Sequence, residues 1–160
     1  MQATPIQTRS LTLAPNTLDD VRAQIEAMNA EERAQLSPDW LARIDATADA
    51  WTLGFAMVHR ATAMKVGSCG FKGPPDAVGM VEIAYGVAPD HQGKGYATEA
   101  AEALVAFAFE HEQVRVVRAH TFADANASAR VLARCGLHRI GEVNDPEDGW
   151  VWRWEIHREP

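Results

Sequence analysis

Residues 80–111 constrain the fold most, because they read as a strand, a glycine-containing loop and a long helix in direct succession. The first part alternates bulky and small side chains, as a strand with two different faces does. The bulky set is Val81, Ile83, Tyr85 and Val87, and the opposite set is Glu82, Ala84 and Gly86. The last part repeats apolar residues with helical spacing, which predicts a helix packed on a sheet. Its apolar stripe consists of Ala97, Ala101, Leu104, Val105 and Ala108.

The other segments predict further strands and helices, without an internal repeat, a linker or a low-complexity stretch. Strands are predicted at residues 9–13, 51–59, 64–72, 114–121, 137–143 and 150–157. Helices are predicted to fill most of residues 17–48, and a short helix to span residues 126–135. The runs between residues 51 and 87 look like an antiparallel meander, because short polar or turn-rich connections separate them. We therefore expect one domain over residues 1–160.

The composition is that of an ordinary globular domain, and it argues against several classes of protein. The chain has 15 Lys and Arg against 22 Asp and Glu, and this net charge of −7 disfavours nucleic acid as a partner. No stretch approaches the roughly 18 apolar residues of a membrane span, so no membrane partner is expected. Two cysteines, Cys69 and Cys135, suit a reducing compartment, and we expect a cytoplasmic protein. Cys135 is expected to be a core residue and not a nucleophile.

The loop between the central strand and the long helix has the properties of an anion site. It consists of Gln92, Gly93, Lys94, Gly95, Tyr96, Ala97 and Thr98. The start of a helix presents unpaired N–H groups and a partial positive charge, and glycines let a phosphate approach those groups closely. Lys94 adds a charge to such a site, and Thr98 adds a hydroxyl. The alternative is that Gly93 and Gly95 only form a tight turn between strand and helix.

Two nucleotide-binding motifs do not fit this loop. The GxxxxGK[ST] pattern is absent, and GxGxxG fails because Thr98 occupies its last position. The loop also follows an antiparallel meander instead of the first strand of a βαβ unit. A dinucleotide-binding fold is therefore disfavoured.

The segment Gln92-x-x-Gly95-x-Ala97, at the head of a helix and after a strand with Glu82, resembles the coenzyme A signature of the GNAT N-acetyltransferase superfamily. A second block begins at Asn126, reads N-A-S-A-R-V-L and is followed by Cys-Gly-Leu. This block resembles the RimJ/RimL-like subgroup of that superfamily. Two motifs in the expected order make the resemblance much stronger than one motif would.

The resemblance implies an α/β (α+β) fold of the GNAT type. This fold has a central mixed sheet that is mostly antiparallel and strongly twisted, with six to seven strands and about four flanking helices. The central strands, here residues 80–87 and 114–121, splay apart at their ends.

The resemblance also implies acetyl-CoA (coenzyme A) as cosubstrate, without a metal. The N–H groups of residues 92–98 would hold the pyrophosphate, and the pantetheine arm would lie between the splayed strands like an added strand. A backbone N–H near Val87 would polarise the thioester carbonyl. Asn126 would bond the pantetheine or the amine side of the cleft, or alternatively would only cap the helix that follows it.

Glu82 and Ser128 are the candidate catalytic residues. An alkylammonium must lose a proton before it attacks a thioester, and Glu82, mid-strand among apolar residues, is the first candidate to accept that proton. The alternative for Glu82 is a structural carboxylate paired with an arginine such as Arg118. Many relatives place a tyrosine acid directly after the position of Leu132, where this chain has Ala133. Ser128 is a candidate proton donor instead, unless it only bonds helix N–H groups.

Together these expectations describe an acetyl-CoA-dependent N-acetyltransferase that acts on a primary amine by direct attack in a ternary complex. The acceptor would be a protein N-terminal α-amine or the amine of a small molecule. The alternative is a catalytically inactive coenzyme A sensor of the same fold.

The last predicted strand carries large apolar side chains on every second residue, which predicts core packing or a homodimer contact. These side chains are Trp150, Trp152, Trp154 and Ile156.

Overall fold

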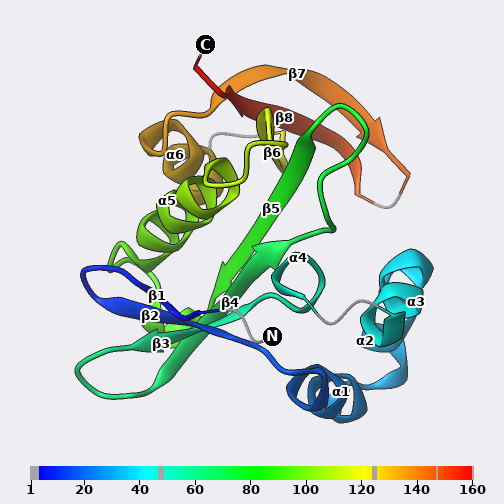
Figure 1. The fold of residues 1–160 in the computed structure, drawn as a ribbon, viewed down its shortest axis with the longest axis vertical. Helices are drawn as coiled ribbons and strands as arrows, with labels where there is room; N and C mark the ends of the chain where they lie inside the picture. The colour runs from blue at the N-terminus through cyan, green and yellow to red at the C-terminus, as the bar shows by residue number, and fades with distance from the viewer. Residues whose placement is uncertain (1–3, 47–48, 124–125, 147, 160) are drawn as a thin grey trace.

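The computed structural model describes residues 4–46, 49–123, 126–146 and 148–159. These residues form one eight-stranded sheet in the order β1-β2-β3-β4-β5-β6-β8-β7 (Figure 1). The strands are β1 (Ile6–Gln7), β2 (Leu11–Pro15), β3 (Phe55–His59), β4 (Lys65–Phe71), β5 (Met80–Val87), β6 (Val116–Phe122), β7 (His138–Asp145) and β8 (Gly149–His157). The helices are α1 (Leu18–Ala27), α2 (Ala30–Ala34), α3 (Pro38–Ala46), α4 (Ala50–Leu53), the 3-10 helix η1 (Pro89–His91), α5 (Tyr96–Phe109) and α6 (Ala127–Arg134). The mixed fold predicted from the sequence is confirmed.

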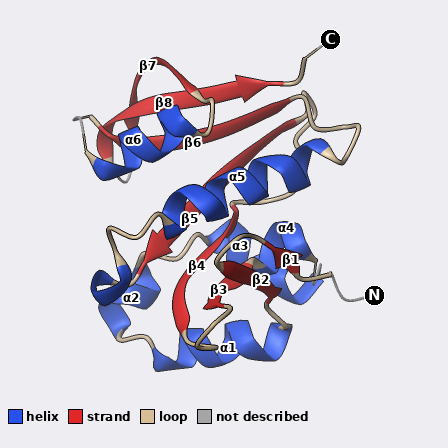
Figure 2. Cartoon of the chain, turned by 90° about the vertical axis from the view of Figure 1, so that its left-hand side faces the viewer, coloured by secondary structure: helices blue, strands red, loops and turns tan. Residues whose placement is uncertain are grey.

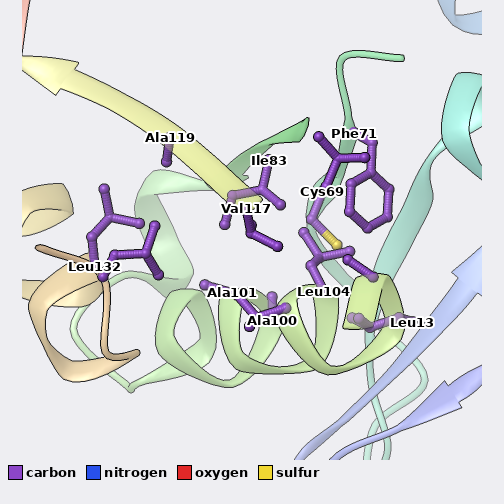
Figure 3. Close-up of a cluster of buried hydrophobic side chains, with 14 of the residues drawn as sticks. Leu13, Cys69, Phe71, Ile83, Ala100, Ala101, Leu104, Val117, Ala119 and Leu132 are labelled. Carbon is purple, nitrogen blue, oxygen red and sulfur yellow. The ribbon is translucent and has the colours of Figure 1, made fainter. Parts of the chain in front are cut away.

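The main hydrophobic core lies between α5 and one face of the sheet (Figure 3). Ala100, Ala101 and Leu104 of α5 lie against Ile83 of β5 and Val117 of β6, and none of these five side chains is more than 2% exposed. Full burial of one Leu- or Ile-sized side chain contributes about 1.5–3 kcal/mol. The predicted apolar stripe of the long helix is therefore the surface that attaches it to the sheet.

The second helix on this face is α6, which lies beside α5 over the strands (Figure 2). Its Leu132 is fully buried in the same core. At the other end of the molecule α1, α2 and α3 lie together, away from α5 (Figure 1). Within the described ranges we find no helix with the length and apolar character that a bilayer crossing requires.

The parallel pair β5 and β6 separates soon after it forms. The ladder between the two strands covers three residue pairs and ends at Glu82↔Arg118, although β5 continues to Val87 and β6 to Phe122. Beyond that point β4 stays paired with β5, and β8 stays paired with β6. Each central strand therefore follows its outer neighbour, and the sheet opens after Glu82. This opening is the predicted splay, and it is confirmed.

The segment before β3 is a helix where the sequence predicts the start of a strand. Asp49 is the N-cap of α4, and its side chain accepts a hydrogen bond from the Thr52 N–H. Gly54, with φ 73°, then redirects the chain into β3, which begins at Phe55. A short apolar run fits a strand and a buried helix equally well, and here the cap decides for the helix.

The large side chains of β8 divide between the core and the surface. Trp154 is 8% exposed and donates a hydrogen bond from Nε1 to Thr121 Oγ1 at 3.0 Å. Trp152 and Ile156 are partly buried against the same core. Trp150 is 61% exposed, because it lies at the hairpin end of the strand, opposite Asn144 of β7. Core packing thus accounts for part of the row, and a homodimer contact stays a prediction.

Glu99 of α5 forms hydrogen bonds with the segment between β1 and β2. Its Oε1 accepts hydrogen bonds from Thr8 Oγ1 at 2.7 Å and from the Ser10 N–H at 2.8 Å. Burial alone would raise the pKa of Glu99, but these hydrogen bonds and the nearby Arg9 outweigh it and lower the pKa below its ordinary value. A carboxyl group with a lowered pKa stabilises the fold when it is ionised.

The variant Glu99→Gln is therefore expected to lower the free energy of unfolding by about 1 kcal/mol at pH 7, since a neutral amide accepts weaker hydrogen bonds. The contribution of Glu99 is present above the unfolded-state pKa of about 4.3 and is lost as the pH falls through the lower, folded-state pKa. Urea unfolding, measured from pH 7 downward, should show that the difference in free energy of unfolding between variant and wild type becomes smaller. Glu102→Gln, at an exposed position of the same helix, is the control and should change little. A difference in free energy of unfolding that stays constant with pH would contradict a stabilising role of the ionised Glu99 carboxylate.

Candidate active site

The predicted anion site lies where β5 leads through η1 into α5. Gly93 has φ 78° and Gly95 has φ 85°, both in the left-handed region that favours glycine. An added Cβ at either glycine would meet no atom within 4 Å. The backbone conformation therefore requires these glycines, and the space beside them is open to a ligand.

The first turn of α5 offers main-chain donors to that space. Gly95 is the N-cap of the helix, and it provides no side-chain hydrogen bond to the N–H groups of the first turn. Such N–H groups carry the positive end of the helix dipole and bind phosphate in many proteins. Gln92 holds the loop in place, because its Nε2 donates to the Val87 carbonyl at 3.0 Å.

A pocket of about 460 Å³ opens beside this loop, between the end of β5, the start of α5 and one side of α6. Arg130 and Arg134 line it from α6, where a spacing of four residues places them on the same side of the helix. Guanidinium groups and uncapped helix N–H groups both favour a polyanion such as a diphosphate. These two arginines were not predicted from the sequence, although their spacing after Asn126 was a signal for them.

Most of the residues predicted to bind the coenzyme line this pocket. They are Val87, Gln92, Gly93, Gly95, Tyr96, Ala97 and Thr98, together with Ser128. Lys94 is exposed and lies outside the lining. Asn126 also lies outside it and caps α6, since its Oδ1 accepts a hydrogen bond from the Ala129 N–H at 2.9 Å. The coenzyme contacts of all these residues, Lys94 and Asn126 included, stay predictions.

A larger hollow of about 680 Å³ lies along the outer side of α5 and shares Gly95, Thr98 and Arg134 with the pocket. Its lining includes three carboxylates, those of Glu99, Glu102 and Glu110. Because carboxylates repel phosphate at short range, the smaller pocket fits a polyanion better in spite of its size.

The edge of β5 that faces the sheet opening presents main-chain donors and acceptors. In an antiparallel ladder, alternate residues point their N–H and C=O groups toward the neighbouring strand. The even-numbered residues of β5 point these groups toward β4. Two hydrogen bonds show this: the Ala88 N–H donates to the Val66 carbonyl, and the Lys72 N–H donates to the Glu82 carbonyl. The N–H groups of Tyr85 and Val87 therefore point toward the opening, where β6 no longer pairs with β5.

Tyr85 reaches across the opening to α6. Its hydroxyl donates to the Ser128 carbonyl at 3.4 Å, and burial raises the pKa of Tyr85 to about 12. The phenol is therefore protonated at neutral pH and acts as a hydrogen-bond donor. Ser128 lines the pocket and is half-buried. Its role as a proton donor stays a prediction.

Glu82 lies at the last paired position of β5 and β6, where the sheet begins to open. Its Oε2 forms an ion pair with Lys72 Nζ at 3.0 Å and a hydrogen bond with His120 Nδ1 at 2.9 Å. The Glu82 side chain is 16% exposed, so it is largely withdrawn from solvent but still reachable. The contacts of Glu82 with His120 and Lys72 were not predicted from the sequence, because they join residues from three separate strands or strand ends.

The alternative partner for Glu82, Arg118, is engaged elsewhere. Arg118 pairs with Glu155 of β8, with both Nε and Nη2 at 2.7 Å from Oε2. The cause is register, because Arg118 stands directly opposite Glu155 in the antiparallel ladder. Glu82 is thus left to its contacts with Lys72 and His120.

Cys135 is a packing residue between α6 and α5. Its Sγ lies 3.7 Å from the Thr98 carbonyl and links the end of α6 to the first turn of α5. Burial, and after it the charge of Glu102, raises the pKa of Cys135 to about 11. At neutral pH the group is a thiol and not a thiolate, which agrees with the expectation that it is no nucleophile.

Comparison with known sequences agrees with this geometry. The sequence profile described as an acetyltransferase (GNAT) domain matches residues 8–138. An uncharacterized N-acetyltransferase of Bacillus subtilis (strain 168), YjdG, is 38% identical over 90 residues, which are 54% of this chain and 51% of that protein. The matched region thus spans about half the length of the curated relatives.

Solved structures share the fold along almost the whole chain. A GNAT-family acetyltransferase from Bacillus anthracis superposes with a TM-score of 0.69 at 18% identity, covering 96% of this chain and 98% of that one. RimL, a ribosomal L7/L12 alpha-N-protein acetyltransferase solved in complex with coenzyme A, superposes with a TM-score of 0.74 at 14% identity and the same coverage. Since the family profile covers most of the sequence and the fold agrees along it, this chain belongs to the acetyltransferase (GNAT) family.

Proposed function

We propose that this protein transfers an acetyl group from acetyl-CoA to a primary amine. One observation carries the proposal: the uncapped start of α5 and the carboxylate of Glu82 lie at the two ends of the same sheet opening. The start of α5 suits a diphosphate, and the Glu82 carboxylate suits a cationic amine that has to lose a proton.

The pocket residues fit the coenzyme in three respects. The N–H groups of residues 96–98, with Arg130 and Arg134, would hold the phosphates. The open space at Gly93 and Gly95 would admit them. The outward-facing edge of β5 would pair with the amide-containing pantetheine arm as it would with an added strand. Glu82 and Val87 are about 16 Å apart along the strand, a span that suits an extended arm.

Glu82 would serve as the proton acceptor of the reaction. In the transfer the amine nitrogen forms a bond to the acetyl carbon, and the carbon–sulfur bond breaks. The proton of the amine passes to Glu82, directly or through a water, and the sulfur is released as a thiolate that then takes up a proton. A main-chain N–H group on this edge of β5 would stabilise charge on the carbonyl oxygen.

A protein N-terminal α-amine is the acceptor that we favour, and a small-molecule amine is the second candidate. An α-amine has a pKa near 8, whereas an alkyl amine has one near 10, so the α-amine needs less help from a base. RimL, which shares the fold, is described as acting on a protein α-amine. We further propose that the protein acts in the cytoplasm, which suits its free Cys69 and Cys135.

Release of free thiol from acetyl-CoA tests the proposal, measured with the purified protein across a panel of peptides and small amines. The expected result is amine-dependent thiol release at least about 10-fold above hydrolysis, with a mass increase of one acetyl group on the acceptor. Thermal unfolding should show stabilisation by acetyl-CoA but none by ATP or NAD. Tight coenzyme binding without thiol release from any acceptor would contradict the proposal and favour a coenzyme A sensor.

A further inference from the structure

Four side chains form a row of one ion pair and two hydrogen bonds across the sheet opening. Lys72 follows β4, Glu82 is in β5, His120 is in β6 and Arg153 is in β8. The contacts are Lys72 Nζ to Glu82 Oε2 at 3.0 Å, His120 Nδ1 to the same oxygen at 2.9 Å, and Arg153 Nε to His120 Nε2 at 3.1 Å. Arg153 is next to His120 because the antiparallel register of β6 and β8 places these two residues opposite each other.

The contact with Arg153 determines which ring nitrogen of His120 carries the proton. An arginine has only donors, so His120 Nε2 must accept the hydrogen bond from Arg153 Nε. A neutral imidazole with an accepting Nε2 has its hydrogen on Nδ1. The Nδ1–H therefore donates to Glu82, and the row has one direction from Arg153 through His120 to the carboxylate.

We infer that His120 is a positioning residue for acetyl transfer, one that fixes the orientation of the Glu82 carboxylate at the start of the opening. This inference rests on the proposed function. Within the described part of the chain, both donors to the carboxylate contact Oε2, and none contacts Oε1. That arrangement leaves Oε1 to receive the proton of the acceptor.

His120 is better suited than Lys72 to fix the carboxylate. The side chains of His120 and Glu82 are 17% and 16% exposed, whereas Lys72 is 59% exposed. A hydrogen bond sheltered from water is stronger than an exposed ion pair, which solvent and salt screen. The ring is also held from its far side by Arg153, while the lysine is a flexible chain with a mobile charge.

The substitutions His120→Phe and His120→Asn separate positioning from packing. Phenylalanine retains the ring volume and removes both nitrogens, and we expect it to lower kcat by about 10- to 100-fold, because small misplacements of a catalytic group cost that much. Asparagine can place an amide donor near the position of Nδ1, and we expect it to recover kcat to within about 3-fold of wild type. The KM for acetyl-CoA should be unchanged in both variants, since His120 lies outside the coenzyme pocket lining.

A double variant tests whether His120 acts through Glu82. In the Glu82→Gln background, His120→Phe is expected to have no further effect on kcat, because the group that it positions is already disabled. An equal loss in both backgrounds would show a general structural effect and overturn the inference. If Glu82→Gln lowers turnover while His120→Phe does not, the inference alone fails. If the wild-type protein acetylates no amine, the proposed function fails.

The wild-type protein permits a second test that needs no variant. Nitrogen-15 NMR of the histidine side chains distinguishes a protonated ring nitrogen from an unprotonated one. The expected result is a neutral His120 with its hydrogen on Nδ1. A hydrogen on Nε2 would overturn the inference, because the ring could not then donate to Glu82 while it accepts from Arg153.

Discussion

Gly95→Asp is expected to weaken acetyl-CoA binding by about 100-fold relative to Gly95→Asn. Gly95 is the N-cap of α5, with φ 85° and open space where a side chain would stand. Aspartate places a negative charge at the proposed phosphate site, and repulsion at about 4 Å near a protein surface is worth up to about 4 kcal/mol. Isothermal titration with acetyl-CoA measures the difference.

The asparagine variant is the matched control for this change. Asparagine and aspartate have nearly the same size, both are good N-caps, and both are enriched at left-handed backbone positions, so the two variants differ mainly by one charge. Their difference in affinity should narrow at high salt, because salt screens exposed charges. Equal affinity of the two variants would show that the phosphates do not lie at the start of α5.

Glu82→Gln is expected to lower kcat by about 100- to 1,000-fold and to leave the affinity for acetyl-CoA unchanged, because the removal of a general base commonly costs that much. The amide oxygen can still accept from His120 and Lys72, so the fold should survive. Steady-state kinetics with an alkyl amine and coenzyme titration together measure the two effects. The ratio of wild-type to variant kcat should fall as the pH approaches about 10, where the amine deprotonates without a base.

Glu112→Gln provides the control for that experiment. Glu112 is exposed in the connection between α5 and β6, and its replacement removes the same charge without touching the opening. Turnover of this variant should equal that of wild type at every pH. If Glu82→Gln behaves in the same way, Glu82 is not the proton acceptor, although the proposal for the coenzyme site would not be affected.

Several features could be predicted because they depend on residues close together in the sequence. Gly93 and Gly95 have the backbone angles that only glycine adopts easily, and they precede a helix whose apolar spacing is evident. The alternation around Glu82 in β5 placed its carboxylate on the face opposite the core. Such features follow from local sterics and side-chain period, so a single segment is enough to determine them.

Other features could not be predicted, because they depend on pairings between distant segments. Residues 51–54 fit a strand and a helix equally well, and the cap at Asp49 with its surroundings decided for α4. The alternative considered for Glu82 was a pairing with an arginine such as Arg118, but the register of β6 with β8 places Arg118 opposite Glu155 and pairs it with that residue. A shift of one residue in that register would have turned these side chains to opposite faces.

The sequence by itself determined the glycine loop of residues 92–95, the helix that follows it and the face on which Glu82 lies, because each depends on backbone preferences within a few residues. The tertiary structure alone decided that Lys72, His120 and Arg153 meet at this carboxylate, and that Arg130 and Arg134 reach the pocket. The physical reason is that strand order and register are set by the packing of the whole core, and no local segment contains that information.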